Sequence, residues 1–337
     1  MKIQIAERDV SGGSVRYGDL KIFSSYLNLK KIPRLVSGEI THGWIVREFN
    51  IDPDLVLGSN GLGHKRKAER FFVARKDQED YLRSQGFQDV HAIGHPITYI
   101  ENLGKVKRIE NSLLVMPSHS LPETLEDWHE TDLLYADYLC DYIKGFDCVA
   151  LCLHSADIEK NNWRNLKKLI PLIFEGALLN DRNTYLRMAQ LFSSFEYVTS
   201  NDFGSHVAYA SYFGAKVSVC GPRPKWERSY YESMTLYKNS PQLLNIEEDR
   251  YINNCFVEWY PQFNCFPRNA QLNIEWAKKE LGTQCKRTRT ELKELLGWTK
   301  CGYTKLIFGY TKLIFKRVMK KLYRLQGRFI IKGAQRY

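Results

Sequence analysis

The sequence contains no run of 18 or more uncharged apolar residues, so no membrane-spanning helix is expected. Charged residues in the segment 1–9 stand where a secretory signal peptide needs an apolar core, which predicts a protein that is not exported by that route. The eight cysteines form no C-x-x-C pair and have no histidine at zinc-finger spacing. Free thiols in a reducing cytoplasm are therefore expected, and not disulfides.

Sets of Asp, Glu and His at metal-ligand spacing are also missing, so no metal is expected. The net charge of +11 is unevenly distributed. Residues 286–337 hold 15 Lys or Arg and two acidic residues, whereas the remainder holds 34 basic and 36 acidic residues. This pattern argues against a nucleic-acid-binding body and predicts one basic appendage at the carboxyl end.

Short β-branched and aromatic segments alternate with helical patterns along the chain, which predicts an α/β fold with a mostly parallel sheet. The charged segment 101–110 is the expected linker between two such halves. We therefore predict domains at 1–105, 110–285 and 286–337. Expected strands cover 2–6, 34–40, 54–57, 70–74, 89–93, 112–116, 148–153, 196–199 and 216–220.

The stretch 195–221 combines a buried strand, a polar turn, a helix and a second strand. Gly204, Ser205 and His206 fall in the first turn of the predicted helix, where unpaired N–H groups and a partial positive charge favour phosphates. The alternative is an ordinary strand-helix-strand unit in which the polar residues only cap the helix.

Three successive strands of this half end in small polar residues or histidine. Carboxyl ends of parallel strands lie side by side, so these residues predict a crevice suited to an anionic ligand. They are Ser118, His119 and Ser120; His154; and Ser200 followed by Ser205 and His206. Arg223 and Lys225 follow the next strand and are expected either to touch a phosphate or to be solvated.

Polar residues at strand ends of the first half are candidates for a general base. His42 ranks first, Glu39 second and Asp9 third. Each can also be a polar loop residue whose hydrogen bonds are satisfied within the protein. His95 precedes Pro96, which fixes the backbone, so His95 is expected in the cleft without an assigned role.

Several short phrases resemble glycosyltransferases of the two-Rossmann-domain (GT-B) type from bacterial capsule and O-antigen (lipopolysaccharide) clusters. They are Thr41-His42-Gly43-Trp44, Ala92-Ile93-Gly94-His95-Pro96, Met116-Pro117-Ser118-His119-Ser120, Gly204-Ser205-His206 with Tyr209-Ala210, and Glu294-Leu295-Leu296-Gly297-Trp298. The resemblance covers roughly residues 35–300. It implies two Rossmann-like domains with a central cleft, an acceptor domain followed by a nucleotide-sugar domain.

The resemblance also implies transfer of a sugar, without a metal cofactor, from a nucleotide-sugar to a growing surface polysaccharide or lipid-linked acceptor. The His-Pro and Ser-His elements are similar to those of transferases that use CMP-sialic acid or Kdo, although the acidic base motif of those enzymes is not clear here. The Glu-x7-Glu pattern of retaining enzymes is absent. Remaining alternatives are a nucleotide-sugar 2-epimerase, a polyol-phosphate transferase and a non-catalytic membrane scaffold.

The basic tail contains an exact repeat, in which residues 302–308 recur as 309–315. A seven-residue unit is close to two helical turns, so equivalent side chains fall on nearly one face. An amphipathic basic helix of this kind predicts peripheral binding of residues 296–330 to the anionic inner face of the cytoplasmic membrane. Alternatively, the apolar stripe packs on the body or on a second protomer.

Overall fold

The computed structural model describes residues 3–11, 16–41, 43–45, 52–57, 63–120, 128–224, 227–253, 255–308 and 311. The chain divides into two compact units. Unit 1 contains residues 1–32 and 40–286, and unit 2 contains residues 33–39 and 287–337. Apart from residues 33–39, both segments predicted as Rossmann-like domains fall in unit 1, so the domain boundary near 105–110 stays a prediction.

A five-stranded parallel sheet forms the centre of unit 1, in the order β6-β5-β4-β7-β8. Its strands are β4 (Ile109–Val115), β5 (Cys148–Leu153), β6 (Ile173–Glu175), β7 (Phe195–Ser200) and β8 (Lys216–Val219). Strand β4 lies in the middle of the sheet. Strands β5 and β6 follow on one side, and the chain then returns to add β7 and β8 on the other. Since the order reverses between β4 and β7, their carboxyl ends open a crevice there.

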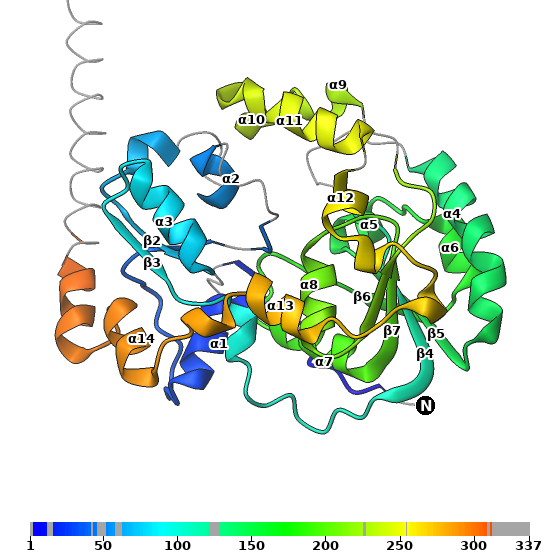
Figure 1. Ribbon diagram of the computed structural model, residues 1–337. Helices are drawn as coiled ribbons and strands as arrows, with labels where there is room; N and C mark the ends of the chain where they lie inside the picture. The colour runs from blue at the N-terminus through cyan, green and yellow to red at the C-terminus, as the bar shows by residue number, and fades with distance from the viewer. Residues whose placement is uncertain are drawn as a thin grey trace, which may run out of the picture. The chain divides into compact units, whose positions relative to one another are not determined.

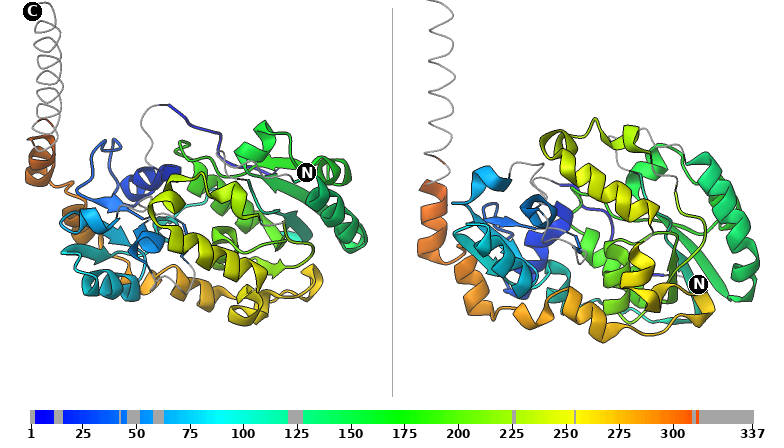
Figure 2. Two further views of the ribbon diagram at one scale, coloured as in Figure 1. Left: turned by 90° about the horizontal axis from the view of Figure 1, so that it is seen from above. Right: turned by 45° about the horizontal axis from the view of Figure 1, so that its top comes forward.

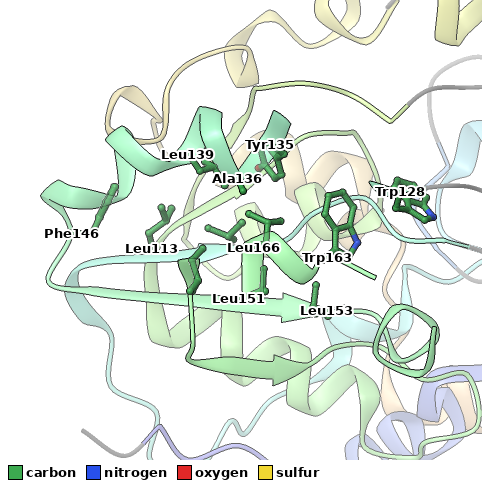
Figure 3. Packing of buried hydrophobic residues seen from close by; sticks show 12 residues of the cluster. Leu113, Trp128, Tyr135, Ala136, Leu139, Phe146, Leu151, Leu153, Trp163 and Leu166 are labelled. Atoms are coloured by element: carbon green, nitrogen blue, oxygen red, sulfur yellow. The ribbon is translucent and has the colours of Figure 1, made fainter. Parts of the chain in front are cut away.

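Helices cover both faces of this sheet, as the connections of a doubly wound fold require (Figure 1). They are α4 (His129–Tyr142), α5 (Ser155–Glu159), α6 (Arg164–Leu169), α7 (Thr184–Ser194) and α8 (Ser205–Tyr212), with the 3-10 turn η5 (Ile143–Gly145). Leu139 and Leu166 pack against Leu113 and Leu151, which alternate with residues facing the other side (Figure 3). This cluster fixes α4 and α6 on one face, whereas α7 and α8 contact each other.

A smaller sheet contains β1 (Glu39–Ile40), β2 (Arg70–Val73) and β3 (Asp89–Ala92), in the order β1-β2-β3. Strands β2 and β3 are parallel, with Phe71 opposite Val90. Its core includes Leu82 of α3 (Lys76–Ser84) and Leu57 of α2 (Pro53–Leu57). The remaining elements of this segment are η1 (Arg16–Gly18), α1 (Asp19–Tyr26), η3 (Gly63–Arg66) and η4 (Pro96–Tyr99).

After β8 the chain is helical, and Figure 2 shows its yellow portion on the outer surface of the unit. The elements are α9 (Arg228–Tyr231), α10 (Thr235–Asn239), α11 (Pro241–Ile252), α12 (Cys255–Trp259), η6 (Pro261–Phe263), η7 (Pro267–Asn269), α13 (Ile274–Glu280) and η8 (Thr283–Cys285). Glu280 ends α13 and its Oε2 accepts from Arg75 Nη1 at 2.8 Å and from Trp44 Nε1 at 2.9 Å. This carboxylate therefore holds α13 to loops beside β1 and β2.

Unit 2 contains α14 (Arg289–Leu295) and a helical segment at 300–308. Thr288 and Glu291 form a capping box, which satisfies backbone donors at the start of α14. Leu292 and Leu296 are fully buried, and Trp298 Nε1 donates to the Leu35 carbonyl at 2.8 Å. Ile307 and Phe308 in the first copy of the repeat are exposed, whereas the second copy lies almost wholly outside the described residues.

Three strand predictions were wrong or too long. Of the strand predicted at 2–6, residues 3–6 form no strand, because the amide of Ala6 donates to the Gln190 side chain instead of a neighbouring strand. Residues 54–57 belong to helix α2, where Pro53 at the first position and the Asp52 carboxylate, which accepts from Asp54 N, both favour a helix. The segment 34–40 contributes only β1.

Strand β6 was missed, since none of the expected strands covers Ile173–Glu175. Pro171 separates α6 from β6: the residue before a proline disfavours helical backbone, and Ile170 is extended at φ −126° and ψ 90°. Helix α6 therefore ends at Leu169, and the chain enters the sheet at Ile173. The strands predicted at 70–74, 89–93, 112–116, 148–153, 196–199 and 216–220 are present within a few residues.

Candidate functional site

A pocket of about 420 Å³ lies at the carboxyl ends of β4, β5 and β7. Six of the predicted binding residues line it: Ser118, His119, His154, Gly204, Ser205 and His206. Aromatic and apolar side chains from the α7 and α8 region close its inner side, among them Tyr185, Met188 and Tyr209. The pocket thus lies at the reversal of strand order, with polar groups along one wall.

The amino terminus of α8 opens into this pocket. Gly204 precedes the helix in extended conformation, at φ −165° and ψ −175°, and no side chain of the described residues caps the helix. The nearby Asp202 instead accepts from Phe203 N and pairs with Arg223 at 2.9 Å. The first N–H groups of α8 therefore remain available to an anion.

Arg223 was predicted either to touch a phosphate or to be solvated, and the structure shows a third arrangement, the ion pair with Asp202. Burial raises the pKa of Asp202, whereas the Arg223 guanidinium opposes that shift. Lys225 lies outside the described residues. None of the described residues that line the pocket is a lysine or arginine.

Asn201 organises the polar wall and was not singled out from the sequence. Its Oδ1 accepts from Ser118 N at 2.9 Å and Ser118 Oγ at 3.1 Å, and its Nδ2 donates to the Pro222 carbonyl at 2.8 Å. Asn201 is buried, so these bonds hold the ends of β4, β7 and β8 in fixed positions. The signal in the sequence was a single polar residue at a strand end, which turn chemistry also explains.

His119 and His154 stack on each other, with ring centroids 4.6 Å apart and planes 20° apart. Nδ1 of His154 accepts from Ala156 N at 3.2 Å, so the proton of its neutral ring is on Nε2. Burial, followed by the neighbouring His119, lowers the pKa of His154 to about 4. The His154 ring is therefore a neutral donor near pH 7.

His206 is neutral as well, because burial and then His119 lower its pKa to about 4. Its ring bonds the backbone of Asp202, while Nε2 is buried without a partner among the described residues. The bond to Asp202 must then use Nδ1, and since a carbonyl only accepts, Nδ1 carries the proton. Nε2 is therefore an acceptor, which could receive a hydrogen bond from a ligand hydroxyl.

Three predicted binding residues lie behind the pocket. Ser200 is fully buried and its Oγ accepts from Asp202 N at 3.3 Å. Ser120 is also fully buried, and its Oγ donates to Asp157 Oδ1 at 2.8 Å. His95 is buried, and its Nδ1 accepts from Ile97 N, so Nε2 of the neutral ring donates to the Tyr209 hydroxyl at 3.0 Å.

The three candidate bases have different positions. Asp9 lies in a loop beside Asp181, outside the pocket lining, and Ser11 lowers its pKa by donating to Oδ1. Glu39 is the first residue of β1, and the division of the chain assigns it to unit 2. His42 lies outside the described residues, but its neighbour Gly43 lines the pocket, and the amide of Trp44 donates to Ser205 Oγ at 2.8 Å.

No group of His, Cys, Asp or Glu in the described part of the chain is arranged to hold a metal ion. Likewise, none of the helices within the described ranges is long and apolar enough to cross a membrane.

No protein-family model and no curated protein matches the chain. Among solved structures, it is similar to a mutant of TarM from S. aureus in complex with fondaparinux, alpha-GlcNAc-glycerol and UDP, at 13% identity and a TM-score of 0.31. A second structure of TarM matches at 14% identity and a TM-score of 0.29. Both matches cover 87% of this chain and 53% of TarM, so the chain spans about half the length of these proteins. Such a likeness does not establish a shared fold or activity.

The depressed pKa of His206 predicts acid sensitivity. Between pH 6.5 and 4 the unfolded chain binds a proton at this residue that the folded protein does not bind. The free energy of unfolding should therefore fall as the pH is lowered through this window, by up to about 1.4 kcal/mol per pH unit from this imidazole. Urea unfolding at pH 7, 6 and 5 measures the slope. His206→Gln should have a shallower slope, and identical slopes in both proteins would contradict the assignment.

Proposed function

We propose that the chain is a glycosyltransferase that binds a nucleotide-sugar in the pocket between β4 and β7. The observation that supports this most is the uncapped start of α8 at the reversal of strand order. Sites for phosphate-bearing ligands form at such positions, because strand ends leave a crevice and a helix terminus supplies N–H donors. The phosphates would lie at Gly204, Ser205 and His206.

The proposed reaction breaks the bond between the anomeric carbon and the phosphate oxygen. The acceptor hydroxyl forms the new bond to that carbon and loses its proton to a base. The departing nucleotide keeps the electron pair, and the N–H groups of Ser205 and His206 stabilise the added negative charge. A helix terminus would here serve in place of a metal ion, and His154 Nε2–H would add a neutral donor.

The proposed acceptor is a growing surface polysaccharide or a lipid-linked sugar chain, as the resemblance to capsule and O-antigen enzymes implies. This finer assignment, including a CMP-linked donor as the alternative, rests on the short sequence phrases. The proposed location at the inner membrane face rests on the basic tail.

Nucleotide binding tests the pocket. His206→Ala should weaken binding of UDP, CMP or GDP, whichever the wild-type protein binds, by about fivefold or more, since it removes the Nε2 acceptor for a ligand hydroxyl and one hydrogen bond contributes about 1 kcal/mol. Calorimetric titration measures the dissociation constant. His91→Ala is the matched control, because His91 lies on β3 and pairs with Asp89. A folded His206→Ala protein with wild-type affinity would remove the support for this pocket.

A base from the amino-terminal half should be needed for turnover, and we propose His42, ahead of Glu39 and Asp9. His42→Ala should lower the rate of transfer by about 10²- to 10⁴-fold while leaving nucleotide affinity unchanged, since the base acts on the acceptor. A transfer assay alongside the titration separates the two effects. Near-normal turnover would show that another residue is the base.

The tail should bind anionic membranes. Cutting at Leu296 would remove Trp298, which is bonded to Leu35, so a chain ending at 308 is the better truncation. It should lose sedimentation with vesicles containing phosphatidylglycerol, and a full-length variant with Lys316, Lys320 and Arg324 changed to Gln should bind weakly. Binding that survives the truncation and also about 0.5 M salt, which screens charges within a few ångströms, would refute the membrane role.

A further inference from the structure

A second pocket, of about 210 Å³, lies where the loop after α5 meets the start of α4. Trp128, Asn162, Trp163 and Arg164 line it, together with Asp132 and Lys160. The two indole rings lie side by side, with centroids 5.3 Å apart (Figure 3). None of its lining residues belongs to the pocket between β4 and β7.

Both indole N–H groups at this pocket have no partner among the described residues. Trp128 is 6% exposed and Trp163 is 1% exposed, so little water reaches either ring. An unsatisfied buried donor costs about 1–3 kcal/mol, and native structures contain few of them. Two such donors beside one small pocket indicate a ligand with acceptor oxygens.

The backbone that presents Trp163 is in an unfavourable conformation. Trp163 has φ 59° and ψ 43°, and Asn161 has φ 54°, which is the left-handed region that bulky residues rarely adopt. Such strain costs about 1–3 kcal/mol per residue and persists where surrounding contacts impose it. Here Asn162 N donates to the Asp157 carbonyl at 2.9 Å and Lys167 N donates to the Trp163 carbonyl at 2.9 Å.

Asp157 lies between the two pockets. Its Oδ1 accepts from Ser120 Oγ and from Asn162 Nδ2, both at 2.8 Å, and Ser120 follows His119 of the first pocket. Its Oδ2 is buried without a partner in the described part of the chain. The carboxylate therefore fixes Asn162 at the second pocket relative to the polar wall of the first.

We propose that this second pocket binds a sugar ring. Because Trp128 is 6% exposed and Trp163 is 1% exposed, neither indole presents a ring face to a ligand, which favours a hydroxyl-rich ligand over a stacked planar base. Asn162 Oδ1 can accept from a sugar hydroxyl, and the Arg164 guanidinium can donate to one. Asp132 caps α6 through Asn165 N and Leu166 N, so its charge is already compensated. This site goes beyond the proposed nucleotide site and does not depend on it.

The indole N–H signals of the seven tryptophans provide the test, in ¹⁵N-tryptophan-labelled full-length protein. Methyl glucoside, N-acetylglucosamine and glucuronic acid are titrated separately. At least one of them should shift the Trp128 and Trp163 signals saturably, with a dissociation constant on the order of 1 mM, typical of one small ring. Trp163→Phe keeps the apolar ring but removes the donor, and should weaken binding about fivefold.

Trp276→Phe is the matched control and should leave the affinity unchanged. His206→Gln should also bind the sugar normally, so loss of nucleotide binding and loss of sugar binding are distinguished. If Trp163→Phe does not fold, Asn162→Ala tests the same pocket. The inference is overturned if about 50 mM of every probe leaves both signals unmoved in folded protein, or if the folded substitution binds as tightly as wild type.

Discussion

The parallel pairing of β4 with β7 is the constraint on which the larger sheet depends. Leu113 of β4 lies opposite Val149 on one side and Tyr197 on the other, so β4 is the strand from which the sheet grows in both directions. Helices must then leave β4 and β7 toward opposite faces. The space between their carboxyl ends stays open for this reason, and polar residues placed there face a ligand without disturbing the core.

Polarity in that space comes from dipoles, from neutral rings and from the carboxyl group of Asp202. Asn201 fixes Ser118, the start of α8 supplies N–H groups, and His154 and His206 are held uncharged by burial. The guanidinium of Arg223 is paired with Asp202. An anion bound here would be stabilised by preorganised donors, which need little rearrangement on binding.

The sequence predicted the strands of the larger sheet more accurately than the segments outside it. Strand 148–153 was placed correctly because a short apolar run bounded by turn residues has few alternatives. Residues 55–57 have equally apolar side chains, and Pro53 together with the Asp52 carboxylate favours a helix over a strand there. The site residues at strand ends were placed near the pocket, because the alternation of strands and helices determines which residues lie at the carboxyl edge of the parallel sheet. Which of them face the pocket could not be read, because Ser200 ends β7 and is buried within the sheet, whereas Ser205 begins α8 and lines the pocket.

The Ser205 hydroxyl has one hydrogen to donate and more than one possible acceptor for it. Its oxygen accepts from the Trp44 amide, and the hydroxyl also bonds Tyr209, which is bonded in turn to His95. A ligand oxygen at the start of α8 would compete with Tyr209 for that hydrogen. Rotation about the Cβ–Oγ bond of Ser205 would then move its hydrogen from Tyr209 to the ligand oxygen, while every heavy atom keeps its place. Ligand binding would therefore first change the direction in which hydroxyl hydrogens point. The entropic cost of that change is far smaller than the cost of closing a loop.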